Sequence, residues 1–262
     1  MPTSALHVAR TGLEAQDTRM RVIANNLANV GTTGFKRDRA NFATLTYQDA
    51  RVAGQQSSSE TAYATGLNLG TGVAVQSTTR IETQGALTTT SNPFDLALDG
   101  SGYFQIQLPG GQIGYTRAGN FSRSPEGQIV TGQGYPLLPP ISLPEDARSV
   151  TIAADGTISA MTAGNAEPSE LGQITIASFA NPGGLQAAGD NFMLETAASG
   201  PAQIGVAGEE GRGGIRQGML EASNINIVEE LVDMIECQRA YEINSKMISS
   251  VDEMLRNANQ TL

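Results

Sequence analysis

The sequence has one cysteine, Cys237, and one histidine, His7, among 262 residues. A single cysteine excludes an intramolecular disulfide, and these two residues cannot supply the ligands of a zinc site. A Ser-His-Asp or Cys-His mechanism would have to use His7, near the start of an amphipathic segment, where a surface or interface histidine is the simpler interpretation. No spacing singles out an acid/base pair of carboxylates. The sequence predicts no catalytic residue, no cofactor and no metal site.

Basic clusters and long apolar runs are also scarce. The only local basic cluster is 36–39, and the formal net charge is −10. Binding to nucleic acid phosphates needs clustered Lys and Arg, so we expect no nucleic-acid partner. The apolar runs are too short to insert in a membrane. The N-terminus lacks a cleavable signal pattern. These features indicate a cytosolic protein unless the chain uses an export route without a cleaved signal.

Glycine and proline are almost missing from both ends of the chain. Of 30 glycines, only Gly12 precedes residue 31 and none follows Gly218, and of 11 prolines only Pro2 lies outside 31–218. Both residues disfavour helix interiors. We therefore expect helical ends and a middle punctuated by turns, in the zones 1–30, 31–218 and 219–262.

An apolar seam with alternating steps of three and four residues runs along the N-terminal zone: Leu6, Ala9, Leu13, Gln16, Met20, Ile23, Leu27 and Val30. This is the period of helices wound around each other. Gln16 is its one polar position, which we expect to fix register at a cost in stability. A second stripe of Val8, Ala15 and Val22 indicates more than one neighbour. Burial of the seam is too small to stabilise a lone helix in water, so this helix needs partners.

The C-terminal zone predicts a second long helix. Asn226 and Glu229 have the spacing of a capping box, and no Gly or Pro interrupts the chain from there to Leu262. Its seam is Ile227, Leu231, Met234, Gln238, Tyr241, Ser245, Ile248, Asp252 and Leu255. Long helices at opposite ends of one chain suggest that they pair in a coiled-coil-like inner domain. Cys237 lies beside the seam, as a small packed residue.

The middle of the chain predicts an antiparallel β domain over 73–218. Short stretches with strand character are separated by Gly-containing turns: Val73–Ile81, Phe94–Leu98, Tyr103–Leu108, Ile113–Arg117, Ser149–Ala153, Thr157–Met161, Leu171–Phe179 and Ile215–Leu220. Asp155-Gly156 marks the clearest hairpin. The polar stretch 48–72 is typical of a mobile loop or linker. The fold class is α+β, with segments 1–30, 31–72, 73–218 and 219–262.

Several motifs resemble those of a known family. The resemblance rests on ANNLANV at 24–30, TGFKR at 33–37, DLALDGSGYF at 95–104, YTRAGNF at 115–121, EELVDMI at 229–235 and QRAYEINSK at 238–246. Together they resemble the flagellar basal-body rod protein family across essentially the whole chain. The N-terminal motif of that family falls here on Asn25, Asn26, Leu27, Asn29, Gly34 and Phe35.

The resemblance implies a structural subunit and no enzyme. Chain length and the segments 11–16 and 35–48 resemble distal-rod members, which implies helical polymerisation into a rigid hollow drive shaft. This shaft transmits torque from motor to hook and surrounds the export channel. The alternative is a proximal rod or other axial subunit. The alternative from another class of protein is an enzyme, a cell-wall hydrolase, which would need an acid/base pair in a cleft within 73–218.

The resemblance also implies partners and a location. The partners are further copies of the chain, proximal rod proteins below, hook protein above, the peptidoglycan-level and outer-membrane rings, and the flagellar type III export apparatus. The location is a basal-body rod crossing the periplasm, reached without a cleaved signal. Both helix seams become polymer interfaces. The polar segment becomes an inter-subunit loop that stiffens the tube, represented by Gln48, Gln55, Gln56, Tyr63 and Leu67.

Overall fold

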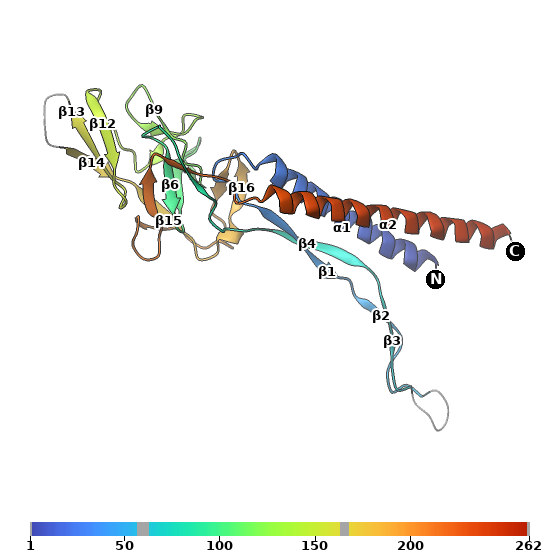
Figure 1. The fold of residues 1–262 in the computed structure, drawn as a ribbon. Coiled ribbons are helices and arrows are strands. Elements are labelled where there is room, and N and C mark those ends of the chain that lie inside the picture. Colours follow the sequence, from blue (N-terminus) through green and yellow to red (C-terminus); the bar gives the residue numbers. More distant parts are fainter. Residues whose placement is uncertain (1, 57–62, 163–167, 261–262) are drawn as a thin grey trace. The chain divides into compact units, whose positions relative to one another are not determined.

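The computed structural model describes residues 2–56, 63–162 and 168–260. A long helix stands at each end, α1 (Pro2–Ala28) and α2 (Ile227–Gln260), and the chain between them is built from short strands (Figure 1). Every strand pair whose register is given is antiparallel. The expected α+β class, with terminal helices and a mainly antiparallel β region, is confirmed. Neither helix, over its described residues, contains an apolar stretch that could span a bilayer.

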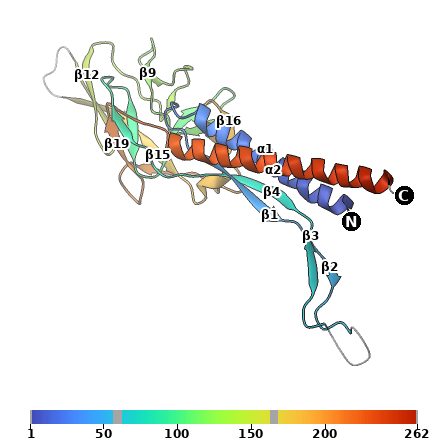
Figure 2. The same ribbon diagram turned by 45° about the vertical axis from the view of Figure 1, so that its right-hand side comes forward.

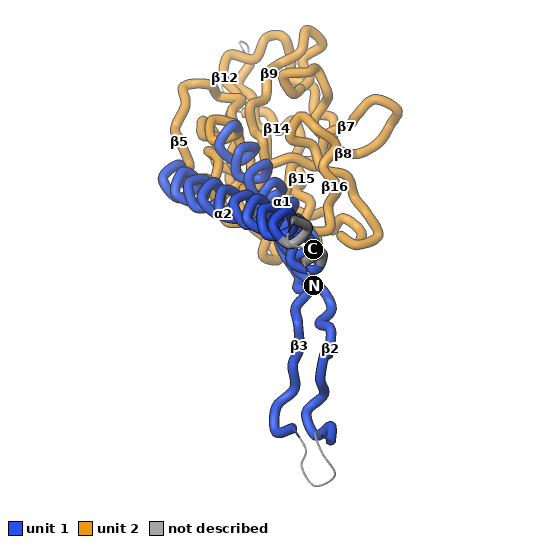
Figure 3. The backbone as a smooth tube through the Cα atoms, turned by 90° about the vertical axis from the view of Figure 1, so that its right-hand side faces the viewer, with its two compact units in different colours: residues 1–28, 38–79, 226–262 blue, residues 29–37, 80–225 orange. Residues whose placement is uncertain are grey.

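The chain forms two compact units (Figure 3). Unit 1 comprises residues 1–28, 38–79 and 226–262, and unit 2 comprises residues 29–37 and 80–225. The predicted segment boundaries divide the chain differently. The difference arises because β4 (Val73–Arg80) pairs with β1 (Asp38–Thr44), which places most of β4 in the same unit as the helices.

In unit 1 the two helices run antiparallel and side by side, with the start of α1 and the end of α2 at the same end of the pair (Figures 1 and 2). The predicted start of α2 is confirmed, because Asn226 Oδ1 accepts a hydrogen bond from the Val228 amide at 3.1 Å. Such a bond satisfies a backbone donor that the first helical turn leaves unpaired. The buried side chains of the two helices are Ala9, Thr11, Ala15, Ile23, Asn26, Glu230, Cys237 and Val251.

Unit 1 also contains a hairpin in which β2 (Tyr47–Arg51) pairs with β3 (Leu67–Gly70), beyond the β1–β4 pair (Figure 2). Tyr47 lies opposite Gly70, and the register shifts between Asp49 and Arg51. Where the sequence suggested a mobile loop or linker over 48–72, the described residues on either side of 57–62 instead include two paired strands. The composition misled because these strands carry polar residues on exposed faces, whereas a sheet is recognised from sequence by one buried face.

Unit 2 is built around a seven-stranded sheet. Its strand order is β16 (Gln186–Gly189), β17 (Phe192–Leu194), β8 (Ile113–Thr116), β7 (Tyr103–Gln107), β15 (Thr175–Ser178) and β18 (Gln203–Val206), with β11 (Leu137–Leu138) also paired to β7. A three-stranded sheet contains β12 (Ala147–Ile152), β13 (Thr157–Thr162) and β14 (Ser169–Gln173). The remaining elements are the pairs β6 (Leu96–Asp99) with β19 (Gly214–Gln217), β5 (Leu87–Thr89) with β20 (Met219–Glu221) and β9 (Ser122–Arg123) with β10 (Ile129–Val130), and a 3₁₀ turn at Pro182–Gly184.

The core of unit 2 joins these sheets. Its fully buried large apolar side chains are Leu96, Leu98, Phe104, Ile106, Ile158, Ile174, Ile176 and Ile215. Phe104 meets Phe121 edge to face, with ring centroids 5.3 Å apart. These residues come from strands that were predicted from their apolar or aromatic character, so the strongest strand signals mark the core.

The predicted hairpin at Asp155-Gly156 is confirmed, with Ile152 opposite Ile158. The stretch predicted as one strand over 171–179 is instead the end of β14 and the whole of β15, in different sheets. The chain changes sheets at Ile174, whose side chain is buried and whose amide donates to the Gly156 carbonyl at 2.8 Å. Apolar patterning continues through this bend, which is why the sequence did not mark it.

Candidate interaction surfaces

The N-terminal seam is buried or half-buried along α1. Ala9 and Ile23 are buried, and the half-buried seam residues are Leu6, Leu13, Gln16, Met20 and Leu27. Val30, the last predicted seam position, lies beyond the helix in unit 2. The thiol of Cys237 donates to the backbone carbonyl of Gln16 at 3.1 Å and lies 3.3 Å from its Oε1. The polar seam position therefore meets a polar partner in α2.

The C-terminal seam is placed differently. Ile227, Leu231, Gln238 and Tyr241 are exposed, whereas Met234, Ile248 and Leu255 are half-buried. The predicted seam includes Leu231, Gln238 and Asp252, which repeat at heptad spacing. On this heptad line the buried residues come one position earlier in the sequence, at Glu230, Cys237 and Val251. Polar contacts occupy this side, including an ion pair between Arg19 Nη2 and Asp233 Oδ1 at 3.0 Å. Sequence reasoning missed the offset because it followed apolar Leu231 and not charged Glu230, whose buried partner Asn26 lies in α1.

As a result, α2 presents a long row of exposed large apolar side chains. They are Ile227, Val228, Leu231, Val232, Ile235, Tyr241, Ile243, Met247 and Met254, each between 42% and 69% exposed. In α1 only Val8 falls in this class among the described side chains, at 37%. Exposed large apolar side chains gathered in this number on one helix favour an interaction site.

The β2–β3 hairpin offers a second exposed surface. Gln48, Gln55, Gln56, Tyr63 and Leu67 are all exposed, and the run Ser57-Ser58-Ser59 lies outside the described residues. Leu67 and Leu69 are two positions apart on one strand, so they lie on the same face, and both exceed 40% exposure. Arg51 stacks its guanidinium 4.1 Å from the centroid of the Tyr63 ring. This contact orders the hairpin without covering its leucines.

A cluster of buried charges in unit 2 was not predicted. The carboxylate of Glu221 is fully buried and pairs with Lys36 Nζ at 2.5 Å and Arg117 Nη1 at 3.1 Å. Burial lowers the pKa of Lys36, partly offset by Glu221. Lys36 and Arg117 both belong to motifs noted in the sequence, but nothing there indicated that they meet.

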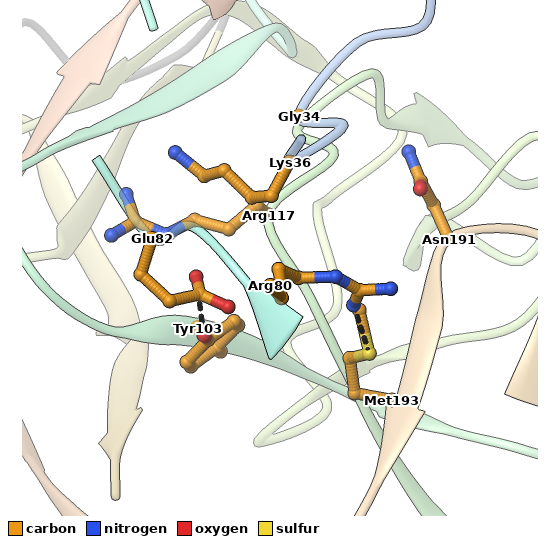
Figure 4. Close-up of a pocket in the computed structure, with 8 residues that line it drawn as sticks. All are labelled: Gly34, Lys36, Arg80, Glu82, Tyr103, Arg117, Asn191 and Met193. Carbon is orange, nitrogen blue, oxygen red and sulfur yellow. Dashed lines mark hydrogen bonds between the residues drawn. The ribbon is translucent and has the colours of Figure 1, made fainter. Parts of the chain in front are cut away.

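A small cavity lies beside this cluster, lined by Gly34, Lys36, Arg80, Glu82, Tyr103, Arg117, Asn191 and Met193 (Figure 4). Tyr103 donates its hydroxyl proton to Glu82 Oε2 at 2.8 Å, and burial raises the pKa of this phenol. The cavity volume is about 10 Å³. That is room for about one water molecule and no substrate. Among the described residues, no group of three or more His, Cys, Asp or Glu side chains is placed to hold a metal ion.

Comparisons with known proteins find flagellar relatives for the start, the middle and the end of the chain. Family models match residues 6–36 (flagella basal body rod protein), 97–160 (flagellar hook protein FlgE/F/G D1 domain) and 216–261 (flagellar basal body rod FlgEFG protein C-terminal). The flagellar basal-body rod protein FlgG of Buchnera aphidicola subsp. Acyrthosiphon pisum is 49% identical over 98% of each chain. FlgG of Caulobacter vibrioides is 48% identical, again over 98% of each chain.

The chain belongs to the FlgG family of flagellar basal-body rod proteins. This family is structural, which confirms the prediction of a structural protein and not an enzyme. It also confirms the resemblance drawn from the motifs at both ends of the chain.

The structure gives the N-terminal FlgG motif a physical role. Asn26 is 1% exposed: its Nδ2 donates to the Asp38 carbonyl at 2.9 Å, and its Oδ1 accepts from the Asp38 amide at 3.0 Å. Asn29 Oδ1 accepts from the hydroxyl of Thr32 at 3.1 Å, within the turn that follows α1. In this part of the motif, side chains hold the backbone where α1 ends.

Gly34 of the same motif lies against the backbone just after β8, and its amide donates to the carbonyl of Glu221 in β20 at 2.8 Å. Gly34 has φ +68°, and a Cβ there would lie 2.6 Å from the backbone carbon of Arg117. Only glycine fits such a left-handed, close approach. Phe35 is buried, whereas Leu27 is half-buried and Asn25 is exposed.

Proposed function

We propose that this chain is a subunit of the distal flagellar rod, which polymerises helically into a rigid hollow shaft around the export channel and transmits torque from motor to hook. The observation that carries the proposal is the row of exposed apolar side chains on α2. Covering each half-exposed side chain contributes roughly 1 kcal/mol. Membership of the FlgG family supports further copies of the same chain as the surface that covers them.

In this proposal the helices of each subunit pack as a coiled-coil-like inner layer. The side of α2 that meets α1 includes the polar residues Glu230 and Asp233, while the exposed row starts with Ile227 and Val228. A helix with apolar residues outside its intramolecular contact needs further neighbours. The predicted seams, from Leu6 to Val30 and from Ile227 to Leu255, are proposed to form the polymer interface together with this row.

The β2–β3 hairpin is proposed as a second contact between subunits. Its strands expose Tyr47, Leu67 and Leu69 on two faces, and it is ordered by its own backbone pairing. A paired hairpin resists bending better than an irregular loop, which supports the proposed stiffening role.

We further propose the partners and the route. The shaft would join proximal rod proteins below and hook protein above, and would turn within the peptidoglycan-level and outer-membrane rings. The subunit would cross the inner membrane through the flagellar type III export apparatus without a cleaved signal, and the rod would stand in the periplasm. Family membership supports these proposals.

Substitution on the exposed row of α2 tests the function. We expect Ile235→Ser with Ile243→Ser to abolish polymers seen by electron microscopy of the purified chain, because both large apolar side chains are lost from the contact. Monomer stability should stay within about 0.5 kcal/mol, since both residues are more than half exposed. Glu242→Ser, at an exposed polar position of the same helix, is the matched control. Normal polymers from the double variant would refute the proposed interface.

A second assignment is another axial subunit of the same basal body. The family models favour it as an alternative because their descriptions span FlgE, FlgF and FlgG. Complementation separates the two: the chain should restore motility to a strain lacking FlgG and not to one lacking FlgF. The reverse result would replace the distal assignment.

A further inference from the structure

The chain passes between the two units four times, after residues 28, 37, 79 and 225. Three segments of unit 2 lie next to these passages: 34–37, 81–86 and 221–224. Far apart in sequence, they are hydrogen-bonded to one another within unit 2. Three backbone bonds connect them: the Gly34 amide to the Glu221 carbonyl, the Ile81 amide to the Arg37 carbonyl and the Ala222 amide to the Ala86 carbonyl, each at 2.8 Å.

The side chain of Asn224 links the same three segments. Its Oδ1 accepts from the Arg37 amide at 2.7 Å, and its Nδ2 donates to the carbonyls of Ile81 at 2.8 Å and Thr83 at 3.0 Å. The amide group of Asn224, in the segment that precedes α2, therefore bonds to the segment that follows α1 and to the segment that follows β4.

The carboxylate of Glu221 makes a second link. Its Oε1 accepts from Lys36 Nζ at 2.5 Å and from the Gly85 amide at 2.9 Å. Its Oε2 accepts from Arg117 Nη1 at 3.1 Å, and Arg117 Nη2 donates to the Gly100 carbonyl at 2.7 Å. Through Arg117, the three segments are tied to the body of unit 2.

Close backbone packing accompanies these bonds. A Cβ on Gly85 would lie 1.9 Å from the carbonyl oxygen of Ala222, so the two backbones are in direct contact there. The Glu221 side chain is 0% exposed and that of Lys36 is 3% exposed. Buried, paired charges of this kind hold one geometry, because any displacement leaves a charge uncompensated.

We propose that Glu221, Lys36, Arg117 and Asn224 form a crossing clamp, which holds the segments 34–37, 81–86 and 221–224 of unit 2 together. Torque then enters this unit through hydrogen-bonded backbone and not through flexible linkers. Glu221 and Asn224 are its central residues, because the side chain of each bonds to both of the other two segments. The torque role rests on the proposed function. The clamp itself is a property of the single chain and is tested separately.

Hydrogen exchange of the full-length monomer tests the clamp. In Glu221→Gln, the amides of 34–37, 81–86 and 221–224 should exchange roughly tenfold faster or more, since two buried cations lose their carboxylate. Amides of β6 and β7 in the core should be unchanged. Asp99→Asn is the matched control, because Asp99 pairs with Arg216 at an exposed site. An increase spread evenly over unit 2, or no increase, would overturn the clamp.

Asn224→Ala provides a second variant that leaves no buried charge unpaired. It should raise exchange in the same three segments by a smaller factor, and it keeps the test open if Glu221→Gln does not fold. Unchanged exchange in Asn224→Ala would count against the clamp.

Polymers of the Asn224→Ala chain test the torque role. We expect polymers of normal diameter with a lower persistence length in electron micrographs, because unit 2 of each subunit is then less firmly connected to the subunit interface. Normal stiffness together with faster exchange would overturn the torque role and leave the clamp standing. Failure of the unsubstituted chain to polymerise would overturn the proposed function and the torque role together.

Discussion

Asn26 of α1 donates a hydrogen bond from Nδ2 to the carboxylate of Glu230 in α2, with the two atoms 3.3 Å apart. Both residues are 1% exposed, and Asn26 also holds the backbone of Asp38 through two bonds. One side chain therefore ties together the end of α1, the start of β1 and the first turn of α2.

Replacing this side chain should destabilise unit 1. In Asn26→Ala, the buried groups of Asp38 and Glu230 lose their amide partner, and we expect a loss of about 2–4 kcal/mol in the free energy of unfolding. Urea unfolding followed by far-UV circular dichroism measures it. Arg21→Ala, at an exposed position of the same helix, should change stability by less than about 0.5 kcal/mol. Equal losses in the two variants would contradict the role given to Asn26.

The first turn of α2 supplies a second prediction. Asn226→Ala removes the oxygen that accepts from the Val228 amide, so we expect a loss of about 1 kcal/mol, measured by the same urea unfolding. Asn226→Ser should retain most of the stability, because a serine hydroxyl accepts the same bond. A serine variant as weak as the alanine variant would contradict the role given to the hydrogen bond from the Val228 amide.

Alkaline pH should destabilise unit 2 through Tyr103. Burial, with Glu82 nearby, raises the pKa of this phenol above its ordinary value near 10. Above that pH the unfolded chain releases the proton first, so the stability contributed by Tyr103 is lost as the pH rises. We expect Tyr103→Phe to lose about 1 kcal/mol at neutral pH, because it lacks the bond to Glu82, and to lose less than the unsubstituted chain on going to about pH 11.

The effect of Lys36 on the pH dependence of stability has the opposite sign. Burial lowers the pKa of Lys36, so between its folded and unfolded pKa values the unfolded chain binds more protons, and stability rises with pH. Urea unfolding of Tyr103→Phe against the unsubstituted chain cancels this effect, because both contain Lys36. Tyr47→Phe, at an exposed position, is the control. Identical pH dependence of Tyr103→Phe and the unsubstituted chain would rule out Tyr103 as the cause.

The leucines of the hairpin give a prediction about the polymer. Leu67→Ser with Leu69→Ser should leave monomer stability within about 0.5 kcal/mol, because both side chains are exposed. The polymers should bend more in electron micrographs, since the hairpin loses its apolar contact with a neighbouring subunit. Asn68→Ser, on the opposite face of the same strand, is the matched control. Equally straight polymers from the double variant would refute the proposed hairpin contact.

Much of the fold follows from local sequence. Glycine and proline are almost absent from the ends of the chain, so the positions of both helices could be predicted, and Asn226 marked the start of α2 within a residue. Asp155-Gly156 identified its hairpin because that turn needs a left-handed residue, and Gly156 has φ +89°. The short strands β16 to β18 were missed, because few of their side chains are buried and no alternation marks them.

What the sequence by itself determined is which segments are helical, where strong turns fall and, through its motifs, which family the chain belongs to. Only the tertiary structure decided that the buried heptad line of α2 precedes the predicted one by a residue, that 48–72 contains a hairpin, and that Glu221 meets Lys36 and Arg117. The physical reason is that helix caps and turns depend on neighbouring residues. Which face is buried, and which charges pair, depends on contacts between segments more than a hundred residues apart, such as Lys36 with Glu221.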